Sequence, residues 1–168
     1  GSIADLRYFE CGTAFIINHL SLHPFSISHD AVDPAGFTVK KRETKIGIAT
    51  DLGISTLMVK QHLKECTLLI LEANHDPDML INGPYPWPVK QRIKSRFGHL
   101  SNEQSVKVLS QVYSEDLQEV IFAHMSETNN SSERVLNAFT SMLPRHMRDH
   151  LRITLARQHH PVDPIVLF

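Results

Sequence analysis

Apolar residues along this chain gather in short runs, and polar or turn-forming residues follow each run. Runs of this length and setting predict buried β-strands. The sequence predicts strands at residues 15–17, 20–27, 36–39, 46–49, 68–71, 120–123, 151–155 and 165–168. Turns at Asn18-His19 and at residues 40–44 join the first four of these strands into two hairpins. Pro24 places the middle of its strand at a sheet edge or a bulge, because proline cannot donate to a ladder.

Helical spacing of apolar residues separates several of these strands. It predicts helices at residues 55–65 and 89–97, another that begins after Ser101, and a last one near 131–143. Ser101 with Gln104 forms a capping box, and Ser55 and Asn130 are further candidate caps. Strands that alternate with helices predict an α/β (α+β) fold. Residues 3–168 form one domain on this interpretation, and Gly1-Ser2 is the remnant of a cleaved tag.

The predicted helix at 89–97 is basic, and a proline-rich loop precedes it. Val89, Ile93 and Phe97 are spaced to form its buried side, which leaves the basic residues on a solvated face. Contact of this face with substrate phosphates is the less favoured alternative. Tyr85 and Trp87 are interpreted as packing residues under the loop, and a role in stacking against the substrate is the less favoured alternative.

Histidine or aspartate follows four of the predicted strands at the same end. The second, fourth, fifth and sixth strands lead to His29, Asp51, His75 and His124, and His99 lies between the last two. The carboxyl ends of strands in α/β proteins meet at a crevice. Imidazole and carboxylate are ligands for zinc, manganese or iron, and an aspartate between two histidines can bridge two ions. Each residue alone is more simply a solvated loop residue, but the shared pattern favours a site.

Composition narrows the class of protein. The chain has 168 residues, 42% of them hydrophobic and 21% charged, as in ordinary globular domains. A net charge of −1 argues against a general electrostatic grip on nucleic acid or membrane. Cys11 and Cys66 form neither a zinc spacing nor a disulfide framework, which predicts the reducing cytoplasm. No apolar span predicts a membrane segment or signal peptide.

Four stretches of the chain resemble the metallo-β-lactamase-fold hydrolases, most closely the WalJ/YycJ-type bacterial branch. They are residues 26–39, 45–53, 71–105 and 122–131. The resemblance implies an αββα sandwich with a dinuclear metal site along one edge. The two divalent ions would be zinc, manganese or iron, with no other cofactor. The implied reaction is hydrolysis, with a nucleic-acid phosphodiester as the substrate that we expect.

The resemblance also implies roles for individual residues. His29 and His124 are similar to metal-ligating histidines of the family, and Asp51 is similar to the aspartate that bridges the two ions. His99, in the sequence GHLS, is similar to the histidine that transfer-RNA 3′-processing endonucleases place near the scissile phosphate as a proton donor. The expected catalytic residues are therefore His99 and Asp51. Asn74 and His75 lie in a segment that resembles a pocket lining.

One part of the family pattern has no counterpart in the 168 residues. The signature His-x-His-x-Asp-His is absent, so one ion would keep His29 and Asp51, and the other His124 and Asp51. A catalytic ion usually needs three or more protein ligands. We therefore expect the chain to be the C-terminal part of a hydrolase, which binds metal weakly or not at all and is inactive by itself.

The alternative hypothesis is a non-catalytic half-domain that acts as an interaction or structural fragment. Half of a sandwich exposes a broad apolar face, and such faces associate with partners. A homo-oligomer or a covering N-terminal segment is therefore expected under either hypothesis. The sequence leaves the substrate, the metal and the oligomeric state open.

Overall fold

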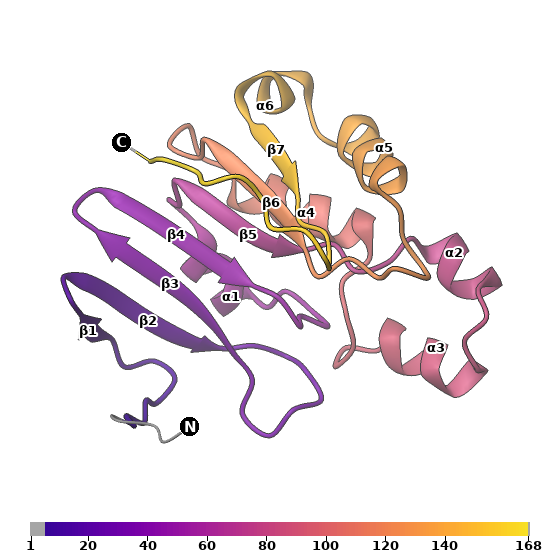
Figure 1. The fold of residues 1–168 in the computed structure, drawn as a ribbon, viewed down its shortest axis with the longest axis horizontal. Helices are drawn as coiled ribbons and strands as arrows, with labels where there is room; N and C mark the ends of the chain where they lie inside the picture. Colours follow the sequence, from indigo (N-terminus) through magenta and orange to yellow (C-terminus); the bar gives the residue numbers. More distant parts are fainter. Residues whose placement is uncertain (1–5, 168) are drawn as a thin grey trace.

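The computed structural model describes residues 6–167, so the predicted tag remnant Gly1-Ser2 lies outside the described residues. Within this range seven strands form one sheet, in the spatial order of their sequence (Figure 1). The strands are β1 (Phe15–Ile17), β2 (Leu20–Ser26), β3 (Ala35–Lys41), β4 (Thr44–Ala49), β5 (Leu68–Glu72), β6 (Glu119–Ala123) and β7 (Arg152–Leu155). β1 to β4 are antiparallel neighbours, and β4 to β7 are parallel neighbours.

Helices cover one face of this sheet and extend beyond one end of it. They are α1 (Leu57–Leu63), α2 (Pro77–Asn82), α3 (Trp87–Lys94), α4 (Asn102–Val112), α5 (Ser132–Met142) and α6 (Arg145–His150). α1 and α4 lie behind the sheet, whereas α2 and α3 lie beyond the edge toward which β4 and β5 point (Figure 1). The mixed sheet with helices confirms the predicted α/β class. None of these helices, within residues 6–167, combines the length and apolar character that a membrane crossing requires.

The core lies between the sheet and the helices behind it. Alternate strand residues such as Ala49, Leu71 and Phe122 point to this layer and are fully buried, because side chains alternate between the faces of a strand. Leu63 of α1 and Leu109 of α4 pack in the same cluster. Burial of apolar side chains on this scale is the main stabilising contribution to a domain of this size.

The opposite face of the sheet carries a second row of apolar residues that are less well covered. Val39, Ile46, Ile48 and Ile70 are half-buried there. The C-terminal stretch after β7 crosses this face (Figure 1), and Ile165 and Leu167 line one cavity with Val39 and Ile46. This stretch has no strand at residues 165–167, so the predicted strand at 165–168 is wrong for its described part.

Local sequence signals set most element ends correctly. Asn18 and His19 adopt positive φ values of 54° and 100°, which confirms the predicted turn between β1 and β2. The capping box of Ser101 with Gln104 is present at α4. Two caps differ from prediction: Thr56 rather than Ser55 caps α1, and Ser131 rather than Asn130 caps α5.

The basic helix α3 is shorter than predicted, and its buried side is narrower. It ends at Lys94, and Ile93 is buried, whereas Val89 and Phe97 are 37% and 49% exposed. The periodic spacing of Val89, Ile93 and Phe97 predicted that all three are buried. That prediction holds only where a helix packs against a core. α3 instead lies beyond the end of the sheet, where little protein surface covers it (Figure 1).

Strand direction explains where the candidate site lies. β2 and β4 are both antiparallel to β3, and β4, β5 and β6 are parallel to one another. These four strands therefore run in the same direction, and their carboxyl ends lie along one edge of the sheet. The residues that follow them are carried to this edge together.

Candidate metal centre

The structure brings four of the sequence-predicted site residues to this edge. Asp51 Oδ1 lies 3.5 Å from His29 Nε2 and 3.6 Å from His124 Nδ1. The His99 ring lies between the other two imidazoles, with its centroid 5.0 Å from that of His29 and 5.1 Å from that of His124. The predicted convergence of these loops is thus observed, whereas their roles as ligands and proton donor stay predictions.

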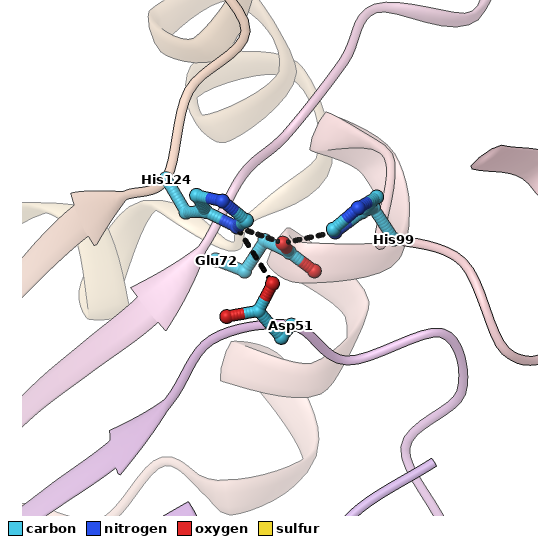
Figure 2. A group of neighbouring side chains, drawn as sticks. All are labelled: Asp51, Glu72, His99 and His124. Carbon is cyan, nitrogen blue, oxygen red and sulfur yellow. Dashed lines mark hydrogen bonds and ion pairs between the residues drawn. The ribbon is translucent and has the colours of Figure 1, made fainter. Parts of the chain in front are cut away.

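A fifth residue, Glu72, lies at the centre of the group and was missed by sequence reasoning. It is the last residue of β5 and is fully buried. Its Oε1 accepts hydrogen bonds from Nδ1 of His124 at 2.6 Å and from Nδ1 of His99 at 2.8 Å (Figure 2). Its Oε2 accepts from the backbone N–H groups of Leu52 and Leu100, both at 3.0 Å. The sequence did contain a signal: Glu72 directly follows the wholly apolar run at residues 68–71. An acid in such a position is buried, and a buried charge requires hydrogen-bond partners.

These bonds determine the charge of Glu72. Burial by itself raises the pKa of this carboxyl group, but hydrogen bonds from His124 and His99 more than offset it and lower the pKa to about 2. The same bond to Glu72 raises the pKa of His124 above its ordinary value. Glu72 is therefore a carboxylate at neutral pH, and it favours positive charge on His124.

Hydrogen bonding also fixes the tautomers of the three histidines. His29 Nδ1 lies 3.1 Å from the carbonyl oxygen of Gly98, which can only accept, so this nitrogen carries the proton. The same reasoning assigns the Nδ1 protons of His99 and His124 to their bonds with Glu72. In their neutral forms all three residues keep a lone pair on Nε2. Metal-ligating histidines commonly donate their other N–H to a carboxylate or carbonyl in this way.

Asp51 and His124 both have left-handed backbone conformations, with φ of 57° and 55°. Non-glycine residues rarely adopt this region, and such strain clusters at functional sites. The amide of Asn74 donates to the carbonyl of His124 at 2.9 Å, and Gly53 N–H donates to the carbonyl of Ser28 at 2.8 Å. Local hydrogen bonds thus hold both loops in place.

His75, a further candidate from the sequence, lies outside the group. It is 3% exposed, and its Nδ1 has no hydrogen-bond partner among residues 6–167. Burial lowers the pKa of His75 to about 4, so it is neutral at physiological pH. Its backbone carbonyl accepts from Asn102 N–H at 2.9 Å. His75 is thus a buried residue that packs behind the site, rather than a member of it.

The solvent side of the site carries an ion pair between Asp30 and Arg92. Nε and Nη2 of Arg92 donate to the two carboxylate oxygens of Asp30, and the Arg92 side chain is 57% exposed. The hydrogen bond from Arg92 lowers the pKa of Asp30 to about 2. Because Asp30 follows His29 directly, this pair fixes α3 against the loop that carries His29.

The donor set fits a divalent cation. Ligand atoms of Asp51, Glu72, His99 and His124 all lie within 4.8 Å of one another. Glu72 already accepts two N–H groups at each oxygen, so we assign it to orienting the imidazoles. Asp51 lies beside the imidazoles of His29 and His124, and imidazole and carboxylate suit zinc, manganese and iron, but the use of these three residues as ligands stays a prediction.

Comparison with known proteins follows this geometry. No protein-family model matches the chain. It is 31% identical over 125 residues to the exodeoxyribonuclease YycJ of Bacillus anthracis, which covers 74% of the chain and 47% of YycJ. The match to the exodeoxyribonuclease WalJ of Streptococcus pneumoniae is also 31% over 125 residues, with 46% of WalJ covered. The aligned stretch is thus about half the length of these relatives.

Solved structures identify the fold. The metallo-β-lactamase fold protein YhfI from Bacillus subtilis superimposes with a TM-score of 0.65 at 11% identity. The superposition covers 89% of the chain and 52% of YhfI. At this identity the match concerns the fold alone.

Proposed function

Since the chain has the metallo-β-lactamase fold and is a relative of the YycJ and WalJ exodeoxyribonucleases, we propose that its site takes part in metal-dependent hydrolysis of DNA phosphodiester bonds. The convergence of His29, Asp51, His99 and His124 around Glu72 carries this proposal. Solvated loop residues with no shared role have no reason to converge. Three imidazoles and a carboxylate that meet at one sheet edge therefore support a common site.

Metal binding would use Asp51 together with Nε2 of His29 and His124. Asp51 Oδ1 lies 3.5 Å from Nε2 of His29 and 3.6 Å from Nδ1 of His124, so it is next to both histidines, which supports the proposed role of this aspartate as a shared ligand. Bound divalent ions would supply Lewis acidity and lower the pKa of water. With one histidine and a shared aspartate for each ion, the described residues offer fewer ligands than a catalytic ion normally has. We therefore propose that this chain alone binds metal weakly and has little activity.

His99 would serve as the proton donor to the leaving oxygen. Its Nδ1–H is held by Glu72, so its Nε2 is the atom that can carry a transferable proton. The carboxylate of Glu72 stabilises the positive charge that His99 has when both nitrogens are protonated. Glu72 itself does not contact the substrate in this proposal and acts by positioning His99 and His124.

The test measures Mn²⁺ binding by calorimetry and cleavage of a 5′-labelled oligonucleotide on the same samples. Wild-type chain should bind Mn²⁺ weakly, and Asp51→Asn should abolish both the binding and any cleavage. His146→Ala, which alters an exposed histidine on α6, is the matched control and should change neither. Cleavage that survives Asp51→Asn would rule out the two-ion mechanism, and a wild-type chain that binds no Mn²⁺ at millimolar concentration contradicts the site itself.

A second proposed role, as an interaction module, is supported by the sheet face opposite α1 and α4. Val39, Ile46, Ile48 and Ile70 are half-buried there, and Ile17 of β1, which the strand register places on the same face, is 47% exposed. Apolar faces of this kind associate with other protein surfaces. A second copy of the chain or a further segment of the same protein is the proposed partner. Sedimentation velocity tests the first case, and a monomer at high concentration would contradict it.

A further inference from the structure

A cavity of about 440 Å³ opens beside the metal centre. His99 and His124 form its inner wall together with Asn74. Its outer wall comes from Tyr85, which precedes α3, and from Arg92 of α3. A volume of this size lies in the range of about 300–1,000 Å³ that is typical of small-molecule sites. The two imidazoles thus face a compartment that can hold part of a substrate.

Tyr85 supplies an aromatic face to this cavity. It lies between Pro84 and Pro86 and is half-buried, so its backbone is stiff and its ring is partly accessible. The sequence favoured a packing role for Tyr85 and Trp87. Trp87 is instead 61% exposed, so the packing interpretation is wrong for Trp87, whereas Tyr85 is half-buried. An aromatic ring at the wall of a cavity is a surface on which a flat ligand can stack.

Arg92 supplies positive charge at the same wall. A guanidinium has five N–H donors, and two atoms of this one, Nε and Nη2, donate to Asp30. That bidentate bond holds the group in a fixed orientation without saturating it. The remaining N–H groups can bind a phosphate, for which arginine geometry is well suited.

The rest of the lining mixes apolar, polar and acidic side chains. Val89, Ile93 and Met125 are its apolar part. Glu127 is its acidic residue, and the Glu127 carboxylate lies 3.0 Å from Nε2 of His159, which supplies a counter-charge when it is protonated. Ser126, Thr128 and Gln158 add hydroxyl and amide groups, which can donate and accept hydrogen bonds at the edge of a base. The tyrosine ring, the guanidinium and these hydroxyl and amide groups together match the base and phosphate of one nucleotide.

We infer that this cavity binds the nucleotide next to the scissile phosphate of single-stranded DNA, with its base stacked on Tyr85 and a phosphate on Arg92. The inference rests on the proposed function and extends it to a substrate class. Inside a duplex, neighbouring bases cover both faces of each base. An unpaired base has a free face, so stacking on Tyr85 selects single strands or frayed ends.

Fluorescence anisotropy with a labelled oligonucleotide in EDTA tests the inference without any metal. Tyr85→Ala should weaken binding about ten-fold, as expected for the loss of one base–aromatic stack. Tyr85→Phe keeps the ring and should retain the affinity. Tyr8→Ala is the matched control, because Tyr8 is 91% exposed and away from the cavity. Thermal melting checks that the variants are folded, and a duplex of the same sequence should bind more weakly than the single strand.

Arg92 gives a second and independent readout. Arg92→Gln should reduce the slope of log affinity against log salt by about 0.7, the value for one phosphate contact on a single strand. Arg145→Gln is its control, because Arg145 is also paired with an aspartate, Asp149, but lies on α6. The inference is overturned if Tyr85→Ala binds like Tyr8→Ala, if the duplex binds as tightly as the single strand, or if the wild type does not bind. Loss of binding in Tyr85→Ala, together with a wild type that binds no Mn²⁺ at millimolar concentration, would support the inference and contradict the proposed function.

Discussion

Two carboxylates beside this site, Glu72 and Asp30, have nearly the same lowered pKa of about 2 but differ in what that pKa means. Glu72 is fully buried and receives four hydrogen bonds, two from imidazoles and two from backbone N–H groups. Asp30 is exposed; its carboxylate accepts from Arg92, and its Oδ1 lies 3.4 Å from Nε2 of His29. An exposed ion pair contributes little because water and salt screen it, whereas removal of one partner from a buried network leaves charge unpaired.

The lowered pKa of Glu72 also determines the pH range in which this residue contributes to the free energy of unfolding. Its pKa in the folded protein lies below that of an unfolded glutamate, about 4.3. The unfolded chain therefore binds more protons in acid, and stability from Glu72 is present above about pH 4 and is lost as the pH falls toward 2. The expected effects of substitution decrease from the buried residues Glu72, His75 and Asn74 to the exposed pair of Asp30 and Arg92.

Glu72→Gln should have the largest effect. The amide cannot replace a carboxylate that accepts from two imidazoles and two backbone N–H groups, so the free energy of unfolding should fall by about 3 kcal/mol. Urea denaturation measures this loss. Glu43→Gln, at an exposed glutamate, is the matched control and should unfold like the wild type. Equal stability of the two variants would remove the distinction between Glu72 and Asp30.

Acidification should have the next largest effect, through His75. Its pKa in the folded protein is about 4, against about 6.5 for an unfolded histidine. The unfolded chain binds more protons between these values, so stability falls as the pH drops through this range. The contribution of His75 should decrease by about 2 kcal/mol between pH 7 and pH 5. Urea denaturation at both pH values measures the free energy of unfolding. Its decrease between pH 7 and pH 5 should be smaller in His75→Gln than in the wild type. The control His146→Gln should show the same decrease as the wild type.

Asn74→Ala should have a smaller effect on stability and a clear one on the site. The change removes the hydrogen bond from the Asn74 amide to the carbonyl of His124, at a cost of about 1 kcal/mol. It also removes a bond that holds the left-handed backbone of His124 in place. The affinity for Mn²⁺ should therefore be lower than that of the wild type. Asn137→Ala on the exposed side of α5 is the control and should leave metal binding unchanged. If both variants bind Mn²⁺ equally, Asn74 does not position His124.

Asp30→Asn should have the smallest effect. Because its ion pair with Arg92 is in solvent, the thermal midpoint at pH 7 should stay within the error of measurement. An NMR titration of the wild type should still show the pKa of Asp30 well below the ordinary aspartate range. A loss of stability comparable to that of Glu72→Gln would show that solvent does not screen the pair.

The sequence predicted the parts of the molecule that depend on local pattern. Short apolar runs identified the strands, and the polar residues after them identified His29, Asp51 and His124. Prediction failed where tertiary surroundings decide. Glu72 looked like one polar residue among several after β5, and its role depends on Leu52, His99 and Leu100, which are distant in sequence. The exposure of Val89 and Phe97 likewise depends on the position of α3 beyond the sheet.

The left-handed backbone at Asp51 and His124 carries a consequence for laboratory evolution of this chain. An ordinary residue in that conformation costs about 1 kcal/mol relative to glycine, which adopts it freely. A library sorted for thermal resistance alone should therefore accumulate glycine at both positions. The same library sorted for Mn²⁺ binding should reject those clones, so the two selections would favour different residues at positions 51 and 124.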